Sequence, residues 1–212
     1  MKPLLEHRLL LAAPCPSPSP ALFLDRDGVL IQDKHYLSDP DKVVLCHGAK
    51  ALVEQASHHQ RPVIVITNQS GIARGYFLWQ EYEQVTDRLL NLLGSTAPLA
   101  GIYANGHGPD APPTSWRKPS PAMLLAAAED LNLDMSRSLL IGDRLSDLKA
   151  GKRAGLPLLA HVLTGYGAKE RKDVEHWGSQ IQQQPTNKNP DFELMLQKSL
   201  LDFPIDRIAR SG

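Results

Sequence analysis

Five apolar runs of strand length alternate with helical patterns along most of the chain. The runs predict strands at residues 21–24, 62–66, 99–104, 138–141 and 157–160. Apolar residues at helical spacing between them predict helices near 48–59, 79–93, 121–131 and 146–154. Nearly continuous apolar strands that alternate with helices are typical of a parallel sheet covered on both faces. We therefore expect an α/β fold with a doubly wound, Rossmann-like parallel sheet, whose ligand site lies at the carboxyl ends of the strands.

The two ends of the chain have different patterns. A proline-rich segment at 14–20 cannot support a helix or a central strand, so the N-terminal residues predict an extended leader. Residues 178–190 are rich in Gln, Asn and Pro and predict a linker, whereas 191–201 carry apolar residues at helical spacing and predict a short amphipathic helix. The expected organisation is a leader at 1–20, a catalytic domain at 21–177, and a linker with a C-terminal helix at 178–212.

Charge and cysteine content narrow the classes of partner. The 212 residues include 23 basic and 23 acidic ones, so the chain has no net charge with which to attract nucleic acid or an anionic membrane. No stretch approaches the roughly 20 apolar residues of a membrane span. The two cysteines, Cys15 and Cys46, are too few for a disulfide scaffold. We expect a cytoplasmic protein whose partner is a small molecule, with neither nucleic acid nor a membrane.

Polar motifs follow four consecutive predicted strands. They are D-R-D-G at 25–28, T-N-Q-S-G at 67–71, R-K-P at 117–119 and G-D-R-L-S-D at 142–147. Each motif alone is as consistent with an ordinary polar turn as with a functional site. Together, in this order, they bring to one edge of the sheet carboxylates for a cation that prefers oxygen, amides and a hydroxyl for phosphate, and a lysine counter-charge. This combination indicates a site for phosphoryl transfer.

These four motifs resemble those of the haloacid dehalogenase (HAD) superfamily, and they span the core from about residue 21 to 165. The resemblance implies a HAD-type fold with a minimal cap and a magnesium-dependent phosphatase that works through an aspartyl phosphate. Within the superfamily, residues 24–29, 67–75 and 117–119 resemble the D-glycero-D-manno-heptose 1,7-bisphosphate phosphatases, whose nearest relatives are the histidinol phosphatases.

The resemblance also implies roles for individual residues. Asp25 would be the nucleophile and a Mg²⁺ ligand, and Asp143 a further ligand. Asp27 would act as general acid and base and meet the metal through its backbone carbonyl. Thr67 and Lys118 would hold the transferring phosphoryl group.

The resemblance also implies which residues contact the substrate. Arg117 would bind the distal phosphate, and Arg144 stands where the family usually has a lysine that contacts substrate. The other residues implied to line the site are Asn68, Gln69 and Ser70, together with a loop of Asp33, Lys34, His35 and Tyr36. Lys34 and His35 depart from the common pattern of that loop.

A zinc-binding loop of the family's common form is missing. That loop carries a Cys-x-His pair and a Cys-x-Cys pair before R-K-P, whereas here residues 105–107 read N-G-H and 114–116 read T-S-W. Only His107 remains of four ligands, so zinc is not expected.

The expected function is Mg²⁺-dependent hydrolysis of a sugar phosphate monoester, with heptose 1,7-bisphosphate as the first candidate and either its 1- or its 7-monophosphate as product. Hydrolysis of histidinol phosphate or another small molecule is the alternative, and a non-catalytic phosphosugar-binding protein is a more remote one. We expect a monomer or a small homo-oligomer.

Overall fold

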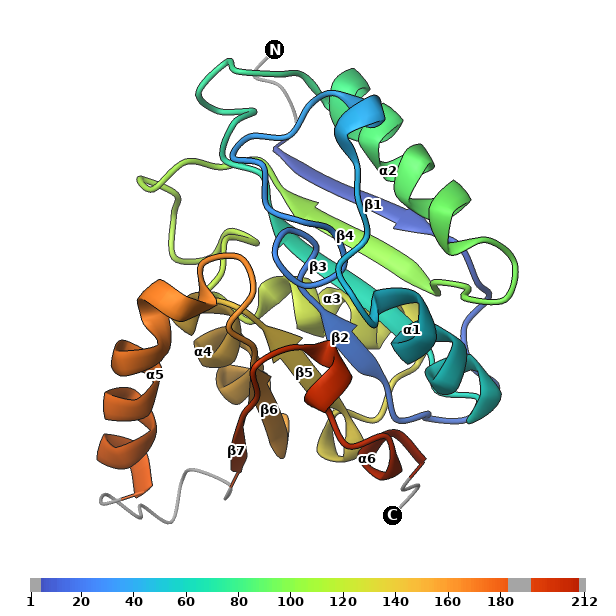
Figure 1. Cartoon of the computed structure of the whole chain (residues 1–212), viewed down its shortest axis with the longest axis vertical. Coiled ribbons are helices and arrows are strands. Elements are labelled where there is room, and N and C mark those ends of the chain that lie inside the picture. The colour runs from blue at the N-terminus through green and yellow to red at the C-terminus, as the bar shows by residue number, and fades with distance from the viewer. Residues whose placement is uncertain (1–4, 183–191, 210–212) are drawn as a thin grey trace.

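A seven-stranded sheet forms the centre of this computed structural model, which describes residues 5–182 and 192–209 (Figure 1). In spatial order the strands are β1 (Glu6–Leu10), β4 (Gly101–Asn105), β3 (Val63–Asn68), β2 (Leu22–Leu24), β5 (Leu139–Gly142), β6 (Leu158–His161) and β7 (Glu193–Leu196). The α-helices are α1 (Ala49–His58), α2 (Trp79–Leu93), α3 (Ala122–Leu131), α4 (Leu145–Arg153), α5 (Gly167–Gln182) and α6 (Asp206–Ala209), and the short 3₁₀ helices are η1 (Pro40–Lys42), η2 (Met135–Arg137) and η3 (Leu200–Asp202).

The predicted α/β class and parallel sheet are confirmed. All five predicted strands and the four helices predicted between them are present, with ends that differ from the prediction by at most two residues. The neighbouring strands β4, β3, β2, β5, β6 and β7 all pair in parallel. In this sheet only β1 runs antiparallel, against β4. Each central strand is buried on both sides because successive side chains point to opposite faces. Leu22 and Leu24 of β2 join one apolar cluster, whereas Phe23 between them joins the other.

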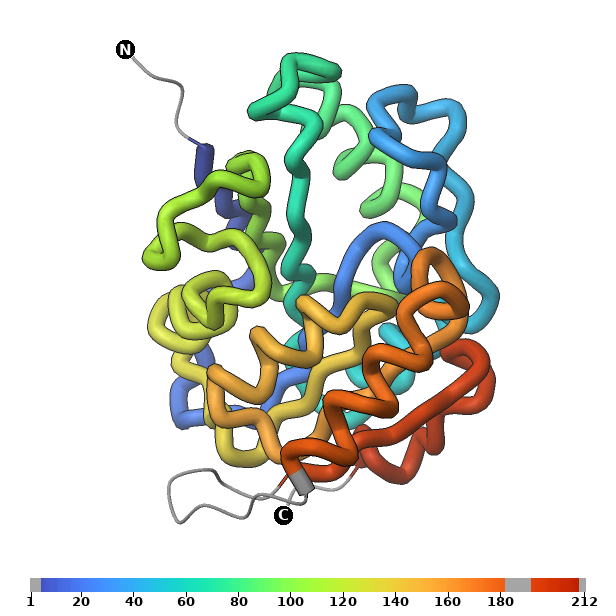
Figure 2. The backbone as a smooth tube through the Cα atoms, turned by 90° about the vertical axis from the view of Figure 1, so that its left-hand side faces the viewer, coloured from blue at the N-terminus to red at the C-terminus, as the bar shows by residue number. Residues whose placement is uncertain are grey.

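Helices cover both faces of the sheet. Buried residues of α1 and α2 pack in the first cluster together with residues of η3 and α6, and those of α3, α4 and α5 pack in the second. The perpendicular view shows α2 (green) and α3 (yellow-green) on opposite sides of the strands (Figure 2). Between β2 and α1 the chain adds only loops and η1, which is too little for a separate cap domain and agrees with the minimal cap expected.

The prediction of an extended leader outside the domain is wrong for Glu6–Leu10. These residues form the edge strand β1, which pairs along its whole length with β4. Side-chain contacts also hold β1 against the helices, since Arg8 forms an ion pair with Asp130 of α3 at 3.0 Å and His7 stacks on Trp79 of α2. The sheet therefore begins before the proline-rich segment.

The C-terminal prediction is also corrected. Residues 178–182 continue helix α5, and the predicted helix at 191–201 is replaced by strand β7, which pairs in parallel with β6, and by η3. Residues 183–191, which include the rest of the predicted linker, lie outside the described residues. Across the described ranges, no helix combines the length and the apolar character needed to cross a membrane.

The chain order places β2 at the middle of the sheet. After β2 it builds β3 and β4 on one side, and then returns to place β5 and β6 on the other. The carboxyl ends of β2 and β5 therefore lie next to each other where the strand order reverses, which is the usual position of a ligand crevice in such sheets. Three of the four sequence motifs lie at the carboxyl ends of β2, β3 and β5, and the motif R-K-P lies in the long loop after β4.

Candidate active site

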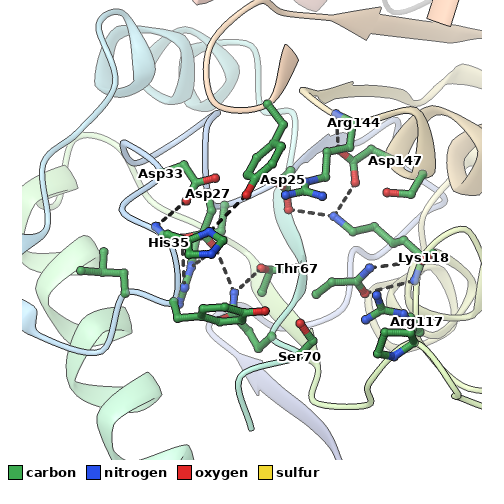
Figure 3. A pocket seen from close by; sticks show the side chains of 18 of the residues that line it. Asp25, Asp27, Asp33, His35, Thr67, Ser70, Arg117, Lys118, Arg144 and Asp147 are labelled. Atoms are coloured by element: carbon green, nitrogen blue, oxygen red, sulfur yellow. Dashed lines mark hydrogen bonds and ion pairs between the residues drawn. The ribbon is translucent and has the colours of Figure 1, made fainter. Parts of the chain in front are cut away.

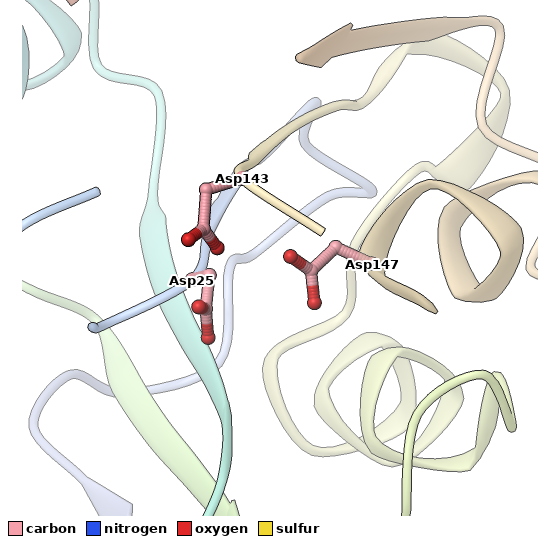
Figure 4. A group of neighbouring side chains, drawn as sticks. All are labelled: Asp25, Asp143 and Asp147. Carbon is pink, nitrogen blue, oxygen red and sulfur yellow. The ribbon is translucent and has the colours of Figure 1, made fainter. Parts of the chain in front are cut away.

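Three buried carboxylates and one buried lysine meet at the carboxyl ends of the central strands. Asp25 follows β2, whereas Asp143 and Asp147 come from the end of β5 and the first turn of α4. One oxygen from each of the three carboxylates lies within 4.8 Å of the others (Figure 4). The Nζ atom of Lys118 lies 2.7 Å from carboxylate oxygens of both Asp25 and Asp147, and donates to the carbonyl of Ile66 at 2.9 Å.

Burial makes this concentration of negative charge unfavourable without a further cation. Burial raises the pKa of Asp143 to about 9, with a contribution from the carboxylates of Asp25 and Asp147, and burial likewise raises the pKa of Asp25 to about 7. Burial would lower the pKa of Lys118, but its two carboxylate partners outweigh it and raise that pKa. One ammonium group thus compensates only part of the charge of three acids.

The residues present fit a magnesium ion. Asp143 is fully buried, and among the described residues no group donates a hydrogen bond to its Oδ1 atom. A buried oxygen without a donor, beside two more carboxylates, is suited to a hard cation that prefers oxygen ligands. Gly28 has a φ of +89°, and a Cβ atom there would come within 2.5 Å of Asp143 Oδ2. The glycine of the first motif therefore leaves room for the acid of the fourth.

Asp147 also has the structural role that its position suggests. Its Oδ2 atom accepts a hydrogen bond from the backbone N–H of Arg144 at 3.0 Å, as an acid in the first turn of a helix commonly does. Its Oδ1 atom faces Lys118. Asp147 therefore caps α4 and holds the lysine at the same time.

The side chain of Asp27 is held apart from the acidic cluster. Arg26, itself buried, donates to both Asp27 oxygens at 3.0 and 3.2 Å, and Gln69 donates to Oδ2 at 2.9 Å. The same Gln69 amide nitrogen lies 2.7 Å from the hydroxyl oxygen of Thr67. These contacts orient Asp27 toward the cavity, beside Thr67 and next to Asp25 (Figure 3).

Asn68 connects the second motif to the third. Its side-chain oxygen accepts from the backbone N–H of Lys118 at 3.1 Å, and its amide donates to the Lys118 carbonyl at 3.2 Å. This pair of bonds fixes the loop that carries Lys118, although the loop follows β4 and Asn68 ends β3. Ser70 lines the cavity beside this connection.

Above the carboxylates, a cavity of about 600 Å³ opens toward a group of arginines. Arg74, Arg117 and Arg144 all line it. Burial and the positive charges of Arg74 and Arg144 lower the pKa of Arg117. Arg144 is partly compensated by Glu170 at 3.8 Å, whereas the side chain of Arg74 has no charged or hydrogen-bonded partner among the described residues. Three positive charges that line one cavity favour the binding of an anion there.

The predicted substrate loop is only partly in the cavity. Asp33, His35 and Tyr36 line it, whereas Lys34 lines a neighbouring cavity with His47 and Lys169. His35 and Tyr36, which follow Lys34, have positive φ values of 53° and 57°. The prediction of a substrate contact is thus not supported for Lys34 by this geometry.

Tyr166 is a cavity residue that the sequence patterns did not reveal. It follows β6, its hydroxyl lies 3.1 Å from Nδ1 of His35, and its ring lies under the Arg144 guanidinium at 3.6 Å. Ligands bind at the carboxyl ends of parallel strands, which include the end of β6, but the residues directly after β6 carry no acidic or basic motif. Arg26 was missed for a different reason, because its role depends on the contacts of a buried side chain.

In the segment that replaces the family's zinc loop, side chains bond to a backbone carbonyl. The carbonyl oxygen of His107 accepts hydrogen bonds from Arg117 at 3.0 Å and from Asn105 at 3.3 Å. Within the described ranges, the only group of three or more acidic, histidine or cysteine side chains placed to hold a metal ion is that of Asp25, Asp143 and Asp147.

Comparisons with known proteins agree with this arrangement. Residues 115–191 match the HAD-hydrolase-like family model. The chain is 46% identical over 144 residues to the D-glycero-beta-D-manno-heptose-1,7-bisphosphate 7-phosphatase of Mesorhizobium japonicum, an alignment that covers 65% of this chain and 66% of that protein.

Two solved structures extend the likeness to most of the fold. A candidate HAD-like phosphatase from Mesorhizobium loti has 33% identity and a TM-score of 0.77, over 99% of this chain and 95% of that one. The D,D-heptose 1,7-bisphosphate phosphatase of B. bronchiseptica, solved with magnesium and phosphate, has 27% identity and a TM-score of 0.70, over 86% of this chain and 94% of that one. The chain therefore belongs to the HAD superfamily of phosphatases, in the branch of the heptose bisphosphate phosphatases.

Proposed function

We propose that this protein hydrolyses a heptose 1,7-bisphosphate, removing the 7-phosphate and leaving the 1-monophosphate. The observation that carries the proposal is the combination of a metal-type carboxylate cluster at the base of the cavity with three arginines near its mouth. The first is suited to the phosphoryl group that is cleaved, and the second to a phosphate that stays on the sugar. The names of the relatives from M. japonicum and B. bronchiseptica support the choice of sugar.

In the proposed reaction, a carboxylate oxygen of Asp25 attacks the phosphorus atom, and the bond from phosphorus to the sugar oxygen breaks. Asp27 gives a proton to the leaving oxygen. It then takes a proton from the water that attacks the aspartyl phosphate, which releases inorganic phosphate and restores Asp25. Arg26 and Gln69 orient Asp27 for both steps, since they hold its two oxygens.

The charge on the transferring group is balanced by fixed partners. Lys118 and Thr67 would bind its oxygens, and Asp25, Asp143 and the backbone carbonyl of Asp27 would hold Mg²⁺. When bound, the ion lets an anionic nucleophile approach an anionic phosphoryl group and stabilises the transition-state charge. The three N–H donors of Lys118 face Asp25, Asp147 and the carbonyl of Ile66, so one of these contacts would be exchanged for an oxygen of the phosphoryl group.

The distal phosphate would lie among the arginines. Arg117 is the central one, because its pKa is lowered in part by Arg74 and Arg144 on the same cavity. A substrate with a second phosphate relieves this repulsion, whereas a monoester with one phosphate does not. The remaining contacts of the sugar are proposed for Asp33, His35, Tyr36, Asn68, Gln69 and Ser70. Histidinol phosphate remains the second candidate because the zinc-loop ligands that usually shape the entrance are absent.

We further propose that the protein works in the cytoplasm as a monomer or small homo-oligomer. Its two cysteines are free thiols, which suits a reducing compartment.

The experiment is phosphate release with Mg²⁺ from both anomers of heptose 1,7-bisphosphate, fructose 1,6-bisphosphate and histidinol phosphate, with Asp25→Asn as the inactive control. We expect the highest kcat/KM for a heptose bisphosphate, the β anomer first, and a phosphate-to-sugar ratio of one. A higher kcat/KM for histidinol phosphate would refute the proposed substrate. Substantial activity in a folded, Mg²⁺-saturated Asp25→Asn variant would refute the mechanism.

A further inference from the structure

A buried histidine contacts the backbone of a proposed metal ligand. His161 is the last residue of β6 and is fully buried, and its Nε2 atom lies 2.9 Å from the carbonyl oxygen of Asp143. Its other ring nitrogen, Nδ1, lies 3.0 Å from Nε of Arg171, which can only donate. Nδ1 must therefore accept, so Nε2 carries the proton and donates to Asp143. The two contacts fix both the tautomer and the ring orientation.

Arg171 is held in turn by the C-terminal segment. It lies on α5, and its Nη2 atom donates to the carbonyl of Gln197 at 2.5 Å and to that of His161 at 3.3 Å. Gln197 directly follows β7, the strand that pairs with β6. A continuous chain of hydrogen bonds thus runs from the end of β7 through Arg171 and His161 to the backbone of Asp143.

The side chain of Asp143 has a single donor on the opposite side. The backbone N–H of Tyr166 donates to its Oδ2 atom at 2.7 Å, whereas Oδ1 has no donor among the described residues. The orientation of the Asp143 carboxylate beside Asp25 and Asp147 therefore depends on two contacts, that of Tyr166 on the carboxylate and that of His161 on the peptide. The backbone N–H of Val162 donates to the carbonyl of Gly142 at 3.1 Å and fixes the peptide before Asp143, whereas the contact of His161 fixes the peptide after it.

We propose that His161 and Arg171 are positioning residues for the divalent cation, because they hold the backbone of Asp143 and so keep its carboxylate beside those of Asp25 and Asp147. The inference rests on the proposed role of Asp143 as a metal ligand. A preoriented ligand loses less conformational freedom when the cation binds, and partners that orient a metal ligand commonly change metal affinity by about tenfold to a hundredfold when they are removed. It also gives the C-terminal strand a role in the site, through Gln197.

The test is Mg²⁺ titration by isothermal calorimetry in the absence of substrate, on full-length variants whose folding is checked by circular dichroism. His161→Leu removes the donor to Asp143 and is expected to raise the Kd for Mg²⁺ about tenfold or more. His161→Gln places an amide donor near the position of Nε2 and is expected to restore most of the affinity. Arg171→Met, which leaves His161 in place, is expected to weaken binding in the same direction and serves if His161→Leu does not fold.

Two reference variants separate the possible failures. Arg61 is also buried and donates to backbone carbonyls, including that of Ile208 at 3.0 Å, but it lies before β3, at the opposite end of the strands. Arg61→Met should lower the melting temperature without changing the Kd for Mg²⁺, and an equal loss of affinity in it would overturn the inference. If Asp143→Asn abolishes Mg²⁺ binding while folded His161→Leu and Arg171→Met bind like wild type, the inference is wrong and the proposed ligand stands. Wild-type affinity in Asp143→Asn would overturn both.

Discussion

At the scale of single residues, identical side chains have different properties because their surroundings differ. Asp25 and Asp143 lie buried in one acidic cluster, and burial raises the pKa of each. Asp27 is two residues from Asp25 in the sequence, but its carboxylate is held by the guanidinium of Arg26 and the amide of Gln69. The proposed division between nucleophile and general acid therefore depends on contacts with neighbours that the motif alone does not specify.

A prediction at this scale concerns the distal phosphate. Arg117→Gln should raise the KM for heptose 1,7-bisphosphate by about tenfold to a hundredfold, because a charge-assisted hydrogen bond contributes about 1.5–3 kcal/mol. Heptose 7-phosphate has no distal group for Arg117 to bind, so its kcat/KM should change by less than about threefold, well below the effect of removing one such hydrogen bond. Steady-state kinetics on both substrates measures the difference.

The matched control for this variant is Arg88→Gln, because Arg88 is an exposed arginine on α2 away from the cavity. It should leave both constants unchanged. Equal losses on the bisphosphate and the monophosphate in Arg117→Gln would place Arg117 at the scissile phosphate and contradict the proposed subsite.

Most of the residues that the sequence motifs single out do line one cavity, but their contacts could not be predicted from the sequence. Residues such as Asp25 and Lys118 could be found because they directly follow apolar runs or lie in a short motif, which are local properties of the chain. The position of Lys34 outside the cavity depends on the course of its loop, and the place of Tyr166 depends on contact with His35, which is 131 residues away. Such features depend on the tertiary structure.

At the scale of elements, the sequence failed where a segment is short, polar or at an edge of the sheet. Strand β1 has the sequence E-H-R-L-L, and its first three residues are polar and two of them contact α2 and α3, so the apolar run at 9–13 overlaps only its last two residues. Strand β7 contains Leu194, Met195 and Leu196, a run too short for periodicity to distinguish a strand from a helix. Helix α5 has few apolar residues, and of those only Val174 is fully buried. The central strands were predicted because burial on both faces demands continuous apolar sequence.

A prediction at this scale tests whether β1 belongs to the folded unit. Deleting residues 1–10 exposes the edge of β4 and removes the pairing of five residues. It also removes Arg8 and His7, which contact Asp130 and Trp79. We expect the melting temperature to fall by more than about 5 °C, because each kcal/mol lost lowers it by about 2–4 °C in a chain of this size. Differential scanning calorimetry measures the change.

The point variant Arg8→Ala is the comparison for this deletion. It removes only a half-exposed ion pair, which contributes at most about 1 kcal/mol, and keeps the strand. If the deletion has no larger effect than Arg8→Ala, β1 is an appendage of the domain and the leader interpretation is restored for residues 6–10.

At the scale of the whole molecule, the sheet concentrates charges that oppose folding. The topology places the ends of β2 and β5 side by side, and with them Asp25, Asp143 and Asp147. Without a cation, burial favours the protonated forms of Asp25 and Asp143, since it raises the pKa of both. The affinity for Mg²⁺ and the stability of the metal-free protein are therefore linked, because the ion requires carboxylates that have lost their protons.

This linkage predicts how stability changes with pH. In the metal-free protein the pKa of Asp143 is raised to about 9 from an ordinary value of 3.8, so the folded state keeps a proton that the unfolded chain has lost. The free energy of unfolding must then fall as pH rises toward 9. Between pH 7.5 and 8.5, above the pKa of about 7 for Asp25, we expect a decrease of up to about 1.4 kcal/mol, or about 3–5 °C in melting temperature.

Magnesium should reverse this trend, since it binds the deprotonated cluster and stabilises the fold more at pH 8.5 than at pH 7.5. Thermal unfolding at both pH values, with EDTA or with excess Mg²⁺, tests the two slopes. The decisive variant is Asp143→Asn, which has no proton to lose and should show a flatter pH dependence in EDTA and little response to Mg²⁺. If wild type and Asp143→Asn share the same slope in EDTA, another group determines the pH dependence, and the buried cluster does not oppose folding in the way its geometry implies.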